Sequence, residues 1–145
     1  HLPENYHIHI CGFGDSSQIK AIVADVSTHS KAQVTFEGEL KGDDYKHFIQ
    51  KCHIGLSTQN PDAAFNSTSF PSKILVYLSN GLKVVTIRIP AIELSAVADY
   101  LYFYNEQSPQ MIAKAIMQAA DEKVDCRHGL KKLDELFINE LKIFL

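Results

Sequence analysis

Short apolar segments alternate with segments of helical periodicity along the chain, and this alternation limits the possible folds more than any other feature. The apolar segments predict strands at 6–11, 34–36, 54–56, 83–89 and 101–104. Helices are predicted after Asp15, over about 45–52, and at 72–80, 109–122 and 128–144. Alternating strands and helices form parallel sheets with helices on both faces. We therefore predict an α/β protein with a Rossmann-like three-layer αβα architecture, whose parallel sheet of about five strands has the order 2-1-3-4-5.

The composition is that of a folded domain. Of the 145 residues, 46% are hydrophobic and 21% charged, which predicts a single domain over residues 1–145. The net charge is −3 and the basic residues do not cluster, so nucleic acid is not an expected partner. Three cysteines without a Cys-x-x-Cys pair, and no apolar run of membrane-spanning length, predict a cytoplasmic protein.

The sequence begins at His1, without an initiator methionine or a signal-peptide pattern. We therefore expect it to be a piece of a longer protein. The functional expectations below refer to that parent.

The segment 69–73 predicts an anion-binding helix start. Pro71 suits the first helical position, and Gly81 ends the helix after roughly three turns. The first amides of a helix lack internal partners and carry the positive end of the dipole, so the Ser72 hydroxyl and Lys73 ammonium stand where phosphate is favoured. A well-capped helix without a ligand is the alternative. The candidate capping residues are Asn66, Ser67, Thr68 and Ser69.

Two motifs near the N-terminus have simpler structural interpretations. Gly12 and Gly14 follow a strand, but Ser17 stands where a dinucleotide fingerprint has its third glycine, so we predict a tight turn. His7 and His9 share one face of a strand without other ligands converging on them. Partly buried or interface histidines are therefore expected, and no metal site.

Cysteine and acidic pairs are likewise read as structural. In 52–53 and 126–128 a cysteine stands near a histidine, but neighbouring residues on a helix point apart, so packed cysteines are expected rather than nucleophiles. Asp43 and Asp44 precede a helix, where capping explains them. The final helix has an apolar face with mixed charges around it, which predicts packing on the core or on a partner domain, with membrane-surface binding as the alternative.

The segment 70–85, read as Phe-Pro-Ser-Lys-Ile-Leu-x-Tyr-Leu-x-x-Gly-Leu-x-Val-Val, resembles the Phe-Pro-Ser-Lys-Ile-Leu-Glu-Tyr-Met-x-x-Gly-x-Pro-Val-Ile signature of GT-B glycosyltransferases of the group-1 clade. The signature belongs to their C-terminal, donor-nucleotide-binding domain. Supporting pieces come in the family's order: a strand ending in Gly-x-Gly, a strand ending in Phe-x-Gly, and a strand that opens a polar loop. The resemblance covers about residues 6–120.

The resemblance implies two groups of binding residues and leaves the catalytic residues unknown. The donor phosphates would bind at Ser69, Phe70, Pro71, Ser72 and Lys73. The nucleotide would bind at Gly12, Gly14, Gly38, Glu39, Leu40, Thr68 and Val76. Transfer in this family leaves a charged diphosphate, which a helix N-terminus and a lysine stabilise. No cofactor is implied beyond the nucleotide-sugar substrate.

The chain also departs from the family pattern. Two glutamates are often found at the positions of Thr68 and Val76, and the second holds the donor ribose. Val76 cannot accept a hydrogen bond, so ribose recognition is displaced, weakened or lost. Lys83 replaces the usual proline before the Val-Val strand. The family's acceptor-binding N-terminal domain has no counterpart in the sequence, nor has the first strand and helix of its donor domain, which carries a phosphate-binding Arg and Lys.

The sequence therefore predicts the donor-binding domain of a glycosyltransferase that moves a sugar from a nucleotide-diphosphate sugar to a glycan or other acceptor, as in polysaccharide biosynthesis. Residues 1–145 alone are expected to be inactive, because the acceptor is held by the missing N-terminal domain. Association of the parent with a membrane surface is an open expectation. The alternative function is a non-catalytic nucleotide- or phosphate-binding regulatory module.

Overall fold

The computed structural model describes residues 1–64, 69–123 and 126–144. The chain divides into two compact units, His1–Phe48 and Ile49–Leu145, which are the N-terminal unit and the C-terminal unit below. Whether the chain behaves as a single domain, as the sequence predicts, stays a prediction.

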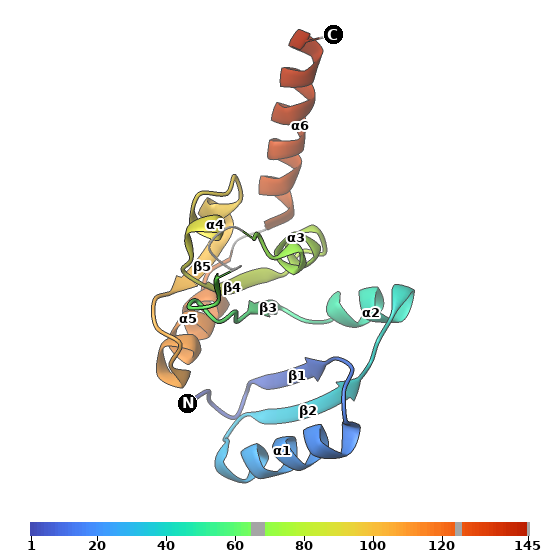
Figure 1. Cartoon of the computed structure of the whole chain (residues 1–145), viewed down its shortest axis with the longest axis vertical. Coiled ribbons are helices and arrows are strands. Elements are labelled where there is room, and N and C mark those ends of the chain that lie inside the picture. Colours follow the sequence, from blue (N-terminus) through green and yellow to red (C-terminus); the bar gives the residue numbers. More distant parts are fainter. Residues whose placement is uncertain (65–68, 124–125, 145) are drawn as a thin grey trace. The chain divides into compact units, whose positions relative to one another are not determined.

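The N-terminal unit contains β1 (His7–Cys11), α1 (Ser16–His29), β2 (Gln33–Gly38) and most of α2 (Gly42–Ile49) (Figure 1). β1 and β2 pair in parallel, and α1 packs on β2. The helix begins at Ser16 because the Asp15 carboxylate caps it, accepting hydrogen bonds from two backbone amides of the first turn at 2.9 and 3.2 Å.

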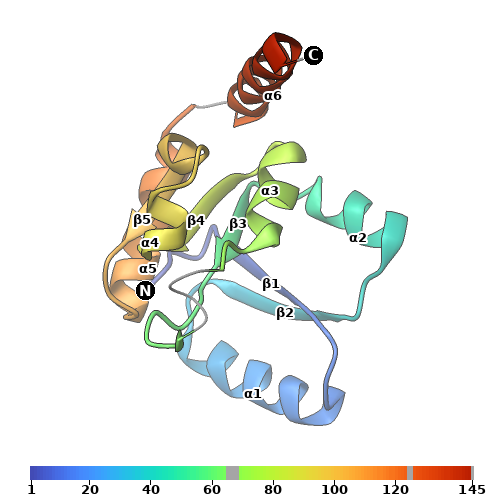
Figure 2. The same cartoon turned by 45° about the horizontal axis from the view of Figure 1, so that its top comes forward.

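The C-terminal unit has a parallel three-stranded sheet in the order β3-β4-β5, formed by Ile54–Ser57, Lys83–Ile87 and Leu101–Tyr104. The helix α3 (Ser72–Ser79) connects β3 with β4, and the single turn α4 (Pro90–Glu93) and a 3₁₀ helix (Ala98–Tyr100) connect β4 with β5. The helices α5 (Pro109–Asp121) and α6 (Cys126–Phe144) complete the unit (Figures 1 and 2).

Helices cover both faces of this sheet. The helix α3 covers one face. Tyr77 of α3 packs so closely on Gly55 of β3 that a Cβ on this glycine would lie 2.3 Å from the ring. The helix α5 covers the other face, where the Lys83 ammonium of β4 donates a hydrogen bond to the Ala119 carbonyl oxygen of α5 at 2.5 Å. Since both faces are covered, four of the five residues of β4 are buried, as expected for a central parallel strand.

The prediction of an α/β fold with parallel strands is confirmed, but the prediction of one sheet in the order 2-1-3-4-5 is wrong. The five strands form two sheets, β1-β2 and β3-β4-β5. The central strand of a doubly wound sheet is apolar on both faces, as β4 is. β1 instead alternates histidine with isoleucine, so one of its faces is polar.

All five predicted strands are present, within one residue at each end except at the carboxyl ends of β2 and β4. Gln33–Gly38 extends β2 by two residues at its carboxyl end, and Lys83–Ile87 ends β4 two residues early. The five predicted helices are also found, and α2 ends at Ile49 before reaching Cys52. The sequence did not predict α4 or the 3₁₀ helix, because four and three residues are too short to show a helical period.

Only the first turn of α6 is well buried. Cys126 is buried, and Gly129 packs so closely on Tyr100 that a Cβ would lie 2.2 Å from its ring. Further along, the helix exposes large apolar side chains: Leu136, Phe137, Ile138, Leu141 and Ile143. The predicted packing on the core is thus confirmed for the start of this helix, and packing on a partner domain stays a prediction for its apolar remainder.

Candidate functional site

The start of α3 lies at the carboxyl end of β3, since β3 and β4 are parallel and the connecting helix must run back along the sheet. Ser72 and Lys73 begin the helix and are exposed, while Pro71 is buried. Ligands of parallel α/β sheets bind at the carboxyl ends of the strands. The structure therefore presents a hydroxyl, an ammonium and the first helical amides at the edge where such a ligand is expected.

Capping of α3 differs from the prediction. Pro71 is the N-cap with φ −72° and ψ 108°, not the first helical residue, and it makes no side-chain capping bond. Its carbonyl oxygen accepts a hydrogen bond from the Ile74 amide at 3.0 Å. Ser69 precedes the cap and is exposed, and Phe70 is partly buried. Asn66, Ser67 and Thr68 lie outside the described residues.

The helix is held by its buried face and by its end. Ile74 and Leu78 are both 0% exposed. At the carboxyl end Gly81 has φ +85°, its amide donates to the Leu78 carbonyl, and the Leu82 amide donates to the Tyr77 carbonyl, each at 3.0 Å. These are the two bonds of a Schellman motif, so the predicted role of Gly81 is confirmed.

Val76 stands four residues after Ser72, on the same side of α3, and is 38% exposed. It presents a hydrocarbon side chain at the position where the resemblance implies a ribose-binding carboxylate. Thr68, the other such position, is outside the described residues.

The remaining predicted nucleotide-binding residues belong to the N-terminal unit. The Gly12 amide donates to the Gly38 carbonyl at 2.9 Å, so the carboxyl ends of β1 and β2 meet there. Gly38 has φ +75°, a conformation that a side chain disfavours. Gly14 lies in the turn before α1, Leu40 is partly buried, and the Glu39 carboxylate is 2.9 Å from the Lys41 ammonium.

The two histidines of β1 bind groups on β2. His7 Nε2 lies 2.7 Å from the Thr35 hydroxyl, and His9 Nδ1 lies 2.7 Å from the Glu37 carboxylate. Their rings stack with centroids 3.8 Å apart, and His9 meets Phe48 edge to face. Among the described residues, no group of three or more His, Cys, Asp or Glu side chains could hold a metal ion.

The next residues to consider are the two cysteine–histidine pairs and the acidic pair. Cys126 is buried and His128 is exposed, and Cys52 is partly buried beside an exposed His53. Asp43 and Asp44 occupy the first turn of α2, where their charges favour the helix dipole.

Lys83 has a structural role that sequence reasoning missed. Its ammonium donates hydrogen bonds to the carbonyl oxygens of Ala119, Ala120 and Glu122 at the end of α5. A lysine is favoured there because it satisfies the last carbonyls and the negative end of the dipole. No local signal could have shown this, since Lys83 and Ala119 are 36 positions apart.

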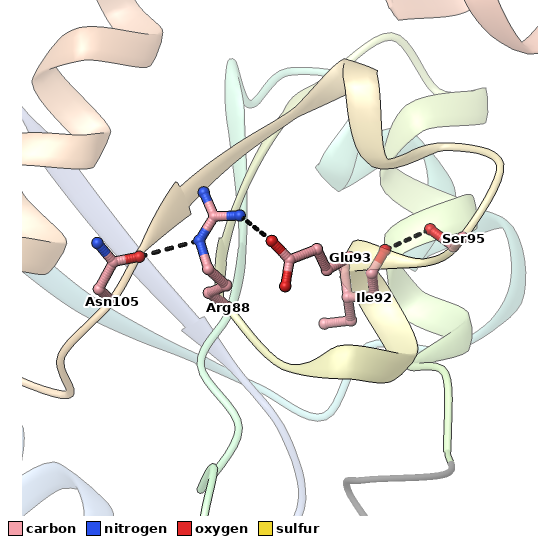
Figure 3. A network of polar contacts seen from close by, with 5 residues as sticks. All are labelled: Arg88, Ile92, Glu93, Ser95 and Asn105. Atoms are coloured by element: carbon pink, nitrogen blue, oxygen red, sulfur yellow. Dashed lines mark hydrogen bonds and ion pairs between the residues drawn. The ribbon is translucent and has the colours of Figure 1, made fainter.

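Arg88 directly follows β4, and its guanidinium makes two hydrogen bonds (Figure 3). It donates to the Asn105 amide oxygen at 3.0 Å and to the Glu93 carboxylate at 2.5 Å, and it lies 4.4 Å from the centre of the Phe103 ring. Arg88 thus braces the β4–α4 turn against the end of β5.

A shallow hollow of about 360 Å³ lies beside β5 and is lined by Arg88, Tyr102 and Glu122 among others. The Tyr102 hydroxyl donates to the Glu122 carboxylate at 2.9 Å. Burial, together with this bond, raises the pKa of Tyr102 to about 12. The hollow does not include the residues of the α3 start.

Two buried polar atoms near the end of β3 have no hydrogen-bond partner in the described part of the chain: Ser57 Oγ and Gln59 Oε1. The sequence places both at the start of the polar loop that leads to α3, but it gives no sign of their burial.

None of the helices that the structure describes combines the length and the apolar character needed to cross a membrane. Comparison of the chain with protein-family models finds no match, and neither does comparison with curated proteins or with solved structures.

Proposed function

We propose that the chain is the donor-nucleotide-binding part of a GT-B-type glycosyltransferase, in which the start of α3 holds the diphosphate of a nucleotide sugar. The observation that carries the proposal is an exposed helix start with Ser72 and Lys73 at the carboxyl end of a parallel strand, behind an N-cap proline that offers no side-chain oxygen. The segment that forms it is the one whose sequence resembles that family.

The helix starts of this chain differ in what satisfies their amides. Asp15 caps α1 and Ser108 caps α5 through side-chain oxygens, whereas α3 has a proline cap that offers none. The single turn α4 is also without a side-chain cap, but it begins at Pro90 and carries Glu93 in its first turn. A phosphate oxygen at α3 would accept from the first amides and would meet the Lys73 ammonium.

In a transfer reaction this arrangement would stabilise the charge that develops on the departing diphosphate. The acceptor would be a glycan or a related molecule held by another part of the parent protein.

A non-catalytic nucleotide- or phosphate-binding module is the second candidate. Val76 favours it, because a partly exposed hydrocarbon stands where a ribose-binding carboxylate is implied. Such a module would bind diphosphates at the α3 start without transferring sugar.

Isothermal titration calorimetry with UDP, GDP, ADP and inorganic pyrophosphate tests the shared part of both candidates. Lys73→Ala should weaken diphosphate binding about tenfold to a hundredfold, the range for loss of a charged hydrogen bond. Lys114→Ala removes an exposed lysine from α5 and should leave binding unchanged. Equal affinity of the wild type and Lys73→Ala would reject the α3 start as the phosphate site. Sugar release from a nucleotide sugar by the parent protein separates the enzyme from the binding module.

A further inference from the structure

Ser57 and Thr86 are neighbouring buried hydroxyls with different hydrogen bonding. They are partners in the register of β3 and β4, and both are 0% exposed. The Thr86 hydroxyl donates to the Ser57 carbonyl oxygen at 3.2 Å, so its own requirement is met. Ser57 Oγ has no partner among the described residues. A buried hydroxyl without a partner costs free energy, and a ligand group that binds it would recover that cost.

The Ser57 hydroxyl faces the first turn of α3. Side chains two residues apart share one face of a strand, and Gly55 on that face contacts the Tyr77 ring. From Tyr77 back to Ser72 the helix covers about 7.5 Å, and from Gly55 forward to Ser57 the strand covers about 6.6 Å. Because α3 runs back along β3, Ser57 lies beneath the helix start that carries Lys73.

Gln59 adds an acceptor two residues further along. Its Oε1 atom is buried and has no partner in the described part of the chain. An amide oxygen only accepts hydrogen bonds, whereas a serine hydroxyl both donates and accepts. An anion alone cannot satisfy this pair, because it offers no proton to Gln59 Oε1. A hydroxyl group can, since it donates to Gln59 and accepts from Ser57.

We infer that Ser57 and Gln59 bind a sugar hydroxyl of a ligand whose phosphate is held at the start of α3. This assignment rests on the proposed function and deepens it, because it gives the chain a hydroxyl-binding pair where Val76 supplies none. The hydroxyl belongs either to the ribose or to the transferred sugar. Both have the same chemistry and both are attached directly to the diphosphate.

The test compares Ser57→Ala and Gln59→Leu with the wild type by calorimetry, using pyrophosphate, the nucleoside diphosphates UDP, GDP and ADP, and the sugar nucleotides UDP-glucose, GDP-mannose and ADP-glucose. Each variant should weaken the best-binding sugar nucleotide about fivefold to tenfold, as expected for loss of one hydrogen bond, and leave pyrophosphate unchanged. An equal loss for the nucleoside diphosphate assigns the hydroxyl to the ribose, and a loss confined to the sugar nucleotide assigns it to the transferred sugar. Thr58→Ala, an exposed hydroxyl between the two residues, is the matched control and should change nothing.

A second measurement uses the protein without ligand. Removing a buried hydroxyl that has no partner should leave the thermal unfolding midpoint of Ser57→Ala equal to the wild type or higher. A lower midpoint would show that the hydroxyl has a structural partner and would overturn the inference. So would unchanged affinities for all nucleotides in both variants, if pyrophosphate still binds in a Lys73-dependent way. Failure of the wild type to bind pyrophosphate or any nucleotide would instead reject the proposed function, and this assignment with it.

Discussion

Both units contain parallel strand pairs, but they differ in how deeply these strands are buried. In the C-terminal unit, β4 lies between two strands and two helical layers, and Val84, Val85 and Thr86 are fully buried. In the N-terminal unit, whose residues are all described, β1 and β2 have one strand partner each, and its buried hydrophobic residues are Leu2 and Ala32. The helix α1 has no buried residue.

This difference in burial indicates which unit supplies the stable core on which the candidate site is built. A two-stranded sheet with one helix is marginal by itself, whereas a three-stranded sheet covered on both faces can sustain a core. The α3 start belongs to the unit with the larger buried core, to which Ile74 and Leu78 attach it. The free energy of unfolding of each unit can be measured separately by urea unfolding, with amide signals of β4 reporting on the C-terminal unit and those of β2 on the N-terminal unit.

The largest expected effect comes from the core of the C-terminal unit. Leu78→Ala removes a fully buried side chain and should lower the free energy of unfolding by about 2–5 kcal/mol. Its counterpart Ile22→Ala, on a helix of the N-terminal unit where the side chain is 57% exposed, should cost under about 1 kcal/mol. Equal costs in the two units would contradict the contrast in burial.

Glycine substitutions sharpen the comparison next. Gly55→Ala places a methyl group within 2.9 Å of three Tyr77 ring atoms and should destabilise β4 signals by about 1–3 kcal/mol. Gly12→Ala meets no atom within 4 Å and should change the free energy by less than about 0.5 kcal/mol. A harmless Gly55→Ala would mean that Tyr77 does not pack on β3.

A smaller effect is expected at the end of α5. Lys83→Met removes the ammonium that binds three carbonyl oxygens there and should cost about 1 kcal/mol. Hydrogen exchange should rise first in the last turn of α5. The control Lys114→Met changes an exposed lysine of the same helix, and a similar rise in that variant would refute the capping role.

The last prediction concerns the pH dependence of stability. It involves two tyrosines of β5 and has no effect at neutral pH. Burial raises the pKa of Tyr104 to about 12, and the pKa of Tyr102 is also about 12. Unfolded tyrosine loses its proton near pH 10. The unfolded state therefore binds fewer protons between pH 10 and 12, and stability should fall across that range while staying constant below it. Tyr104→Phe should flatten the fall. An unchanged slope in this variant would assign the alkaline loss to other groups.

Local patterns predicted most of the secondary structure but not the pairing of the sheets. Periodicity and glycine punctuation placed the strands and the longer helices, and the Gly81 helix end was foreseen from its residue type. The separation of β1-β2 from β3-β4-β5 depends on which strand edges meet, a long-range property. The only local indication of two sheets is the pair of histidines on one face of β1. These histidines were noticed in the sequence, but the division into two sheets was not inferred from them.

The candidate site was predictable to a similar depth. The helix start at Ser72 was predicted from the sequence, but Pro71 was misplaced by one position and the N-cap lacks the expected side-chain oxygen. The buried Ser57 hydroxyl depends on packing of α3 over β3, for which residue types near Ser57 give no sign.

The most direct test of the central claim is a two-dimensional ¹⁵N–¹H NMR titration with pyrophosphate and then with UDP, GDP and ADP. The α1 start provides an internal reference, because the Asp15 carboxylate already accepts from its Ser17 and Gln18 amides. If the α3 start is the diphosphate site, the Ser72 and Lys73 amide signals shift with saturation, the α1 signals do not, and Lys73→Ala weakens the response. Shifts of both helix starts alike, or none at Ser72 and Lys73, would contradict the account.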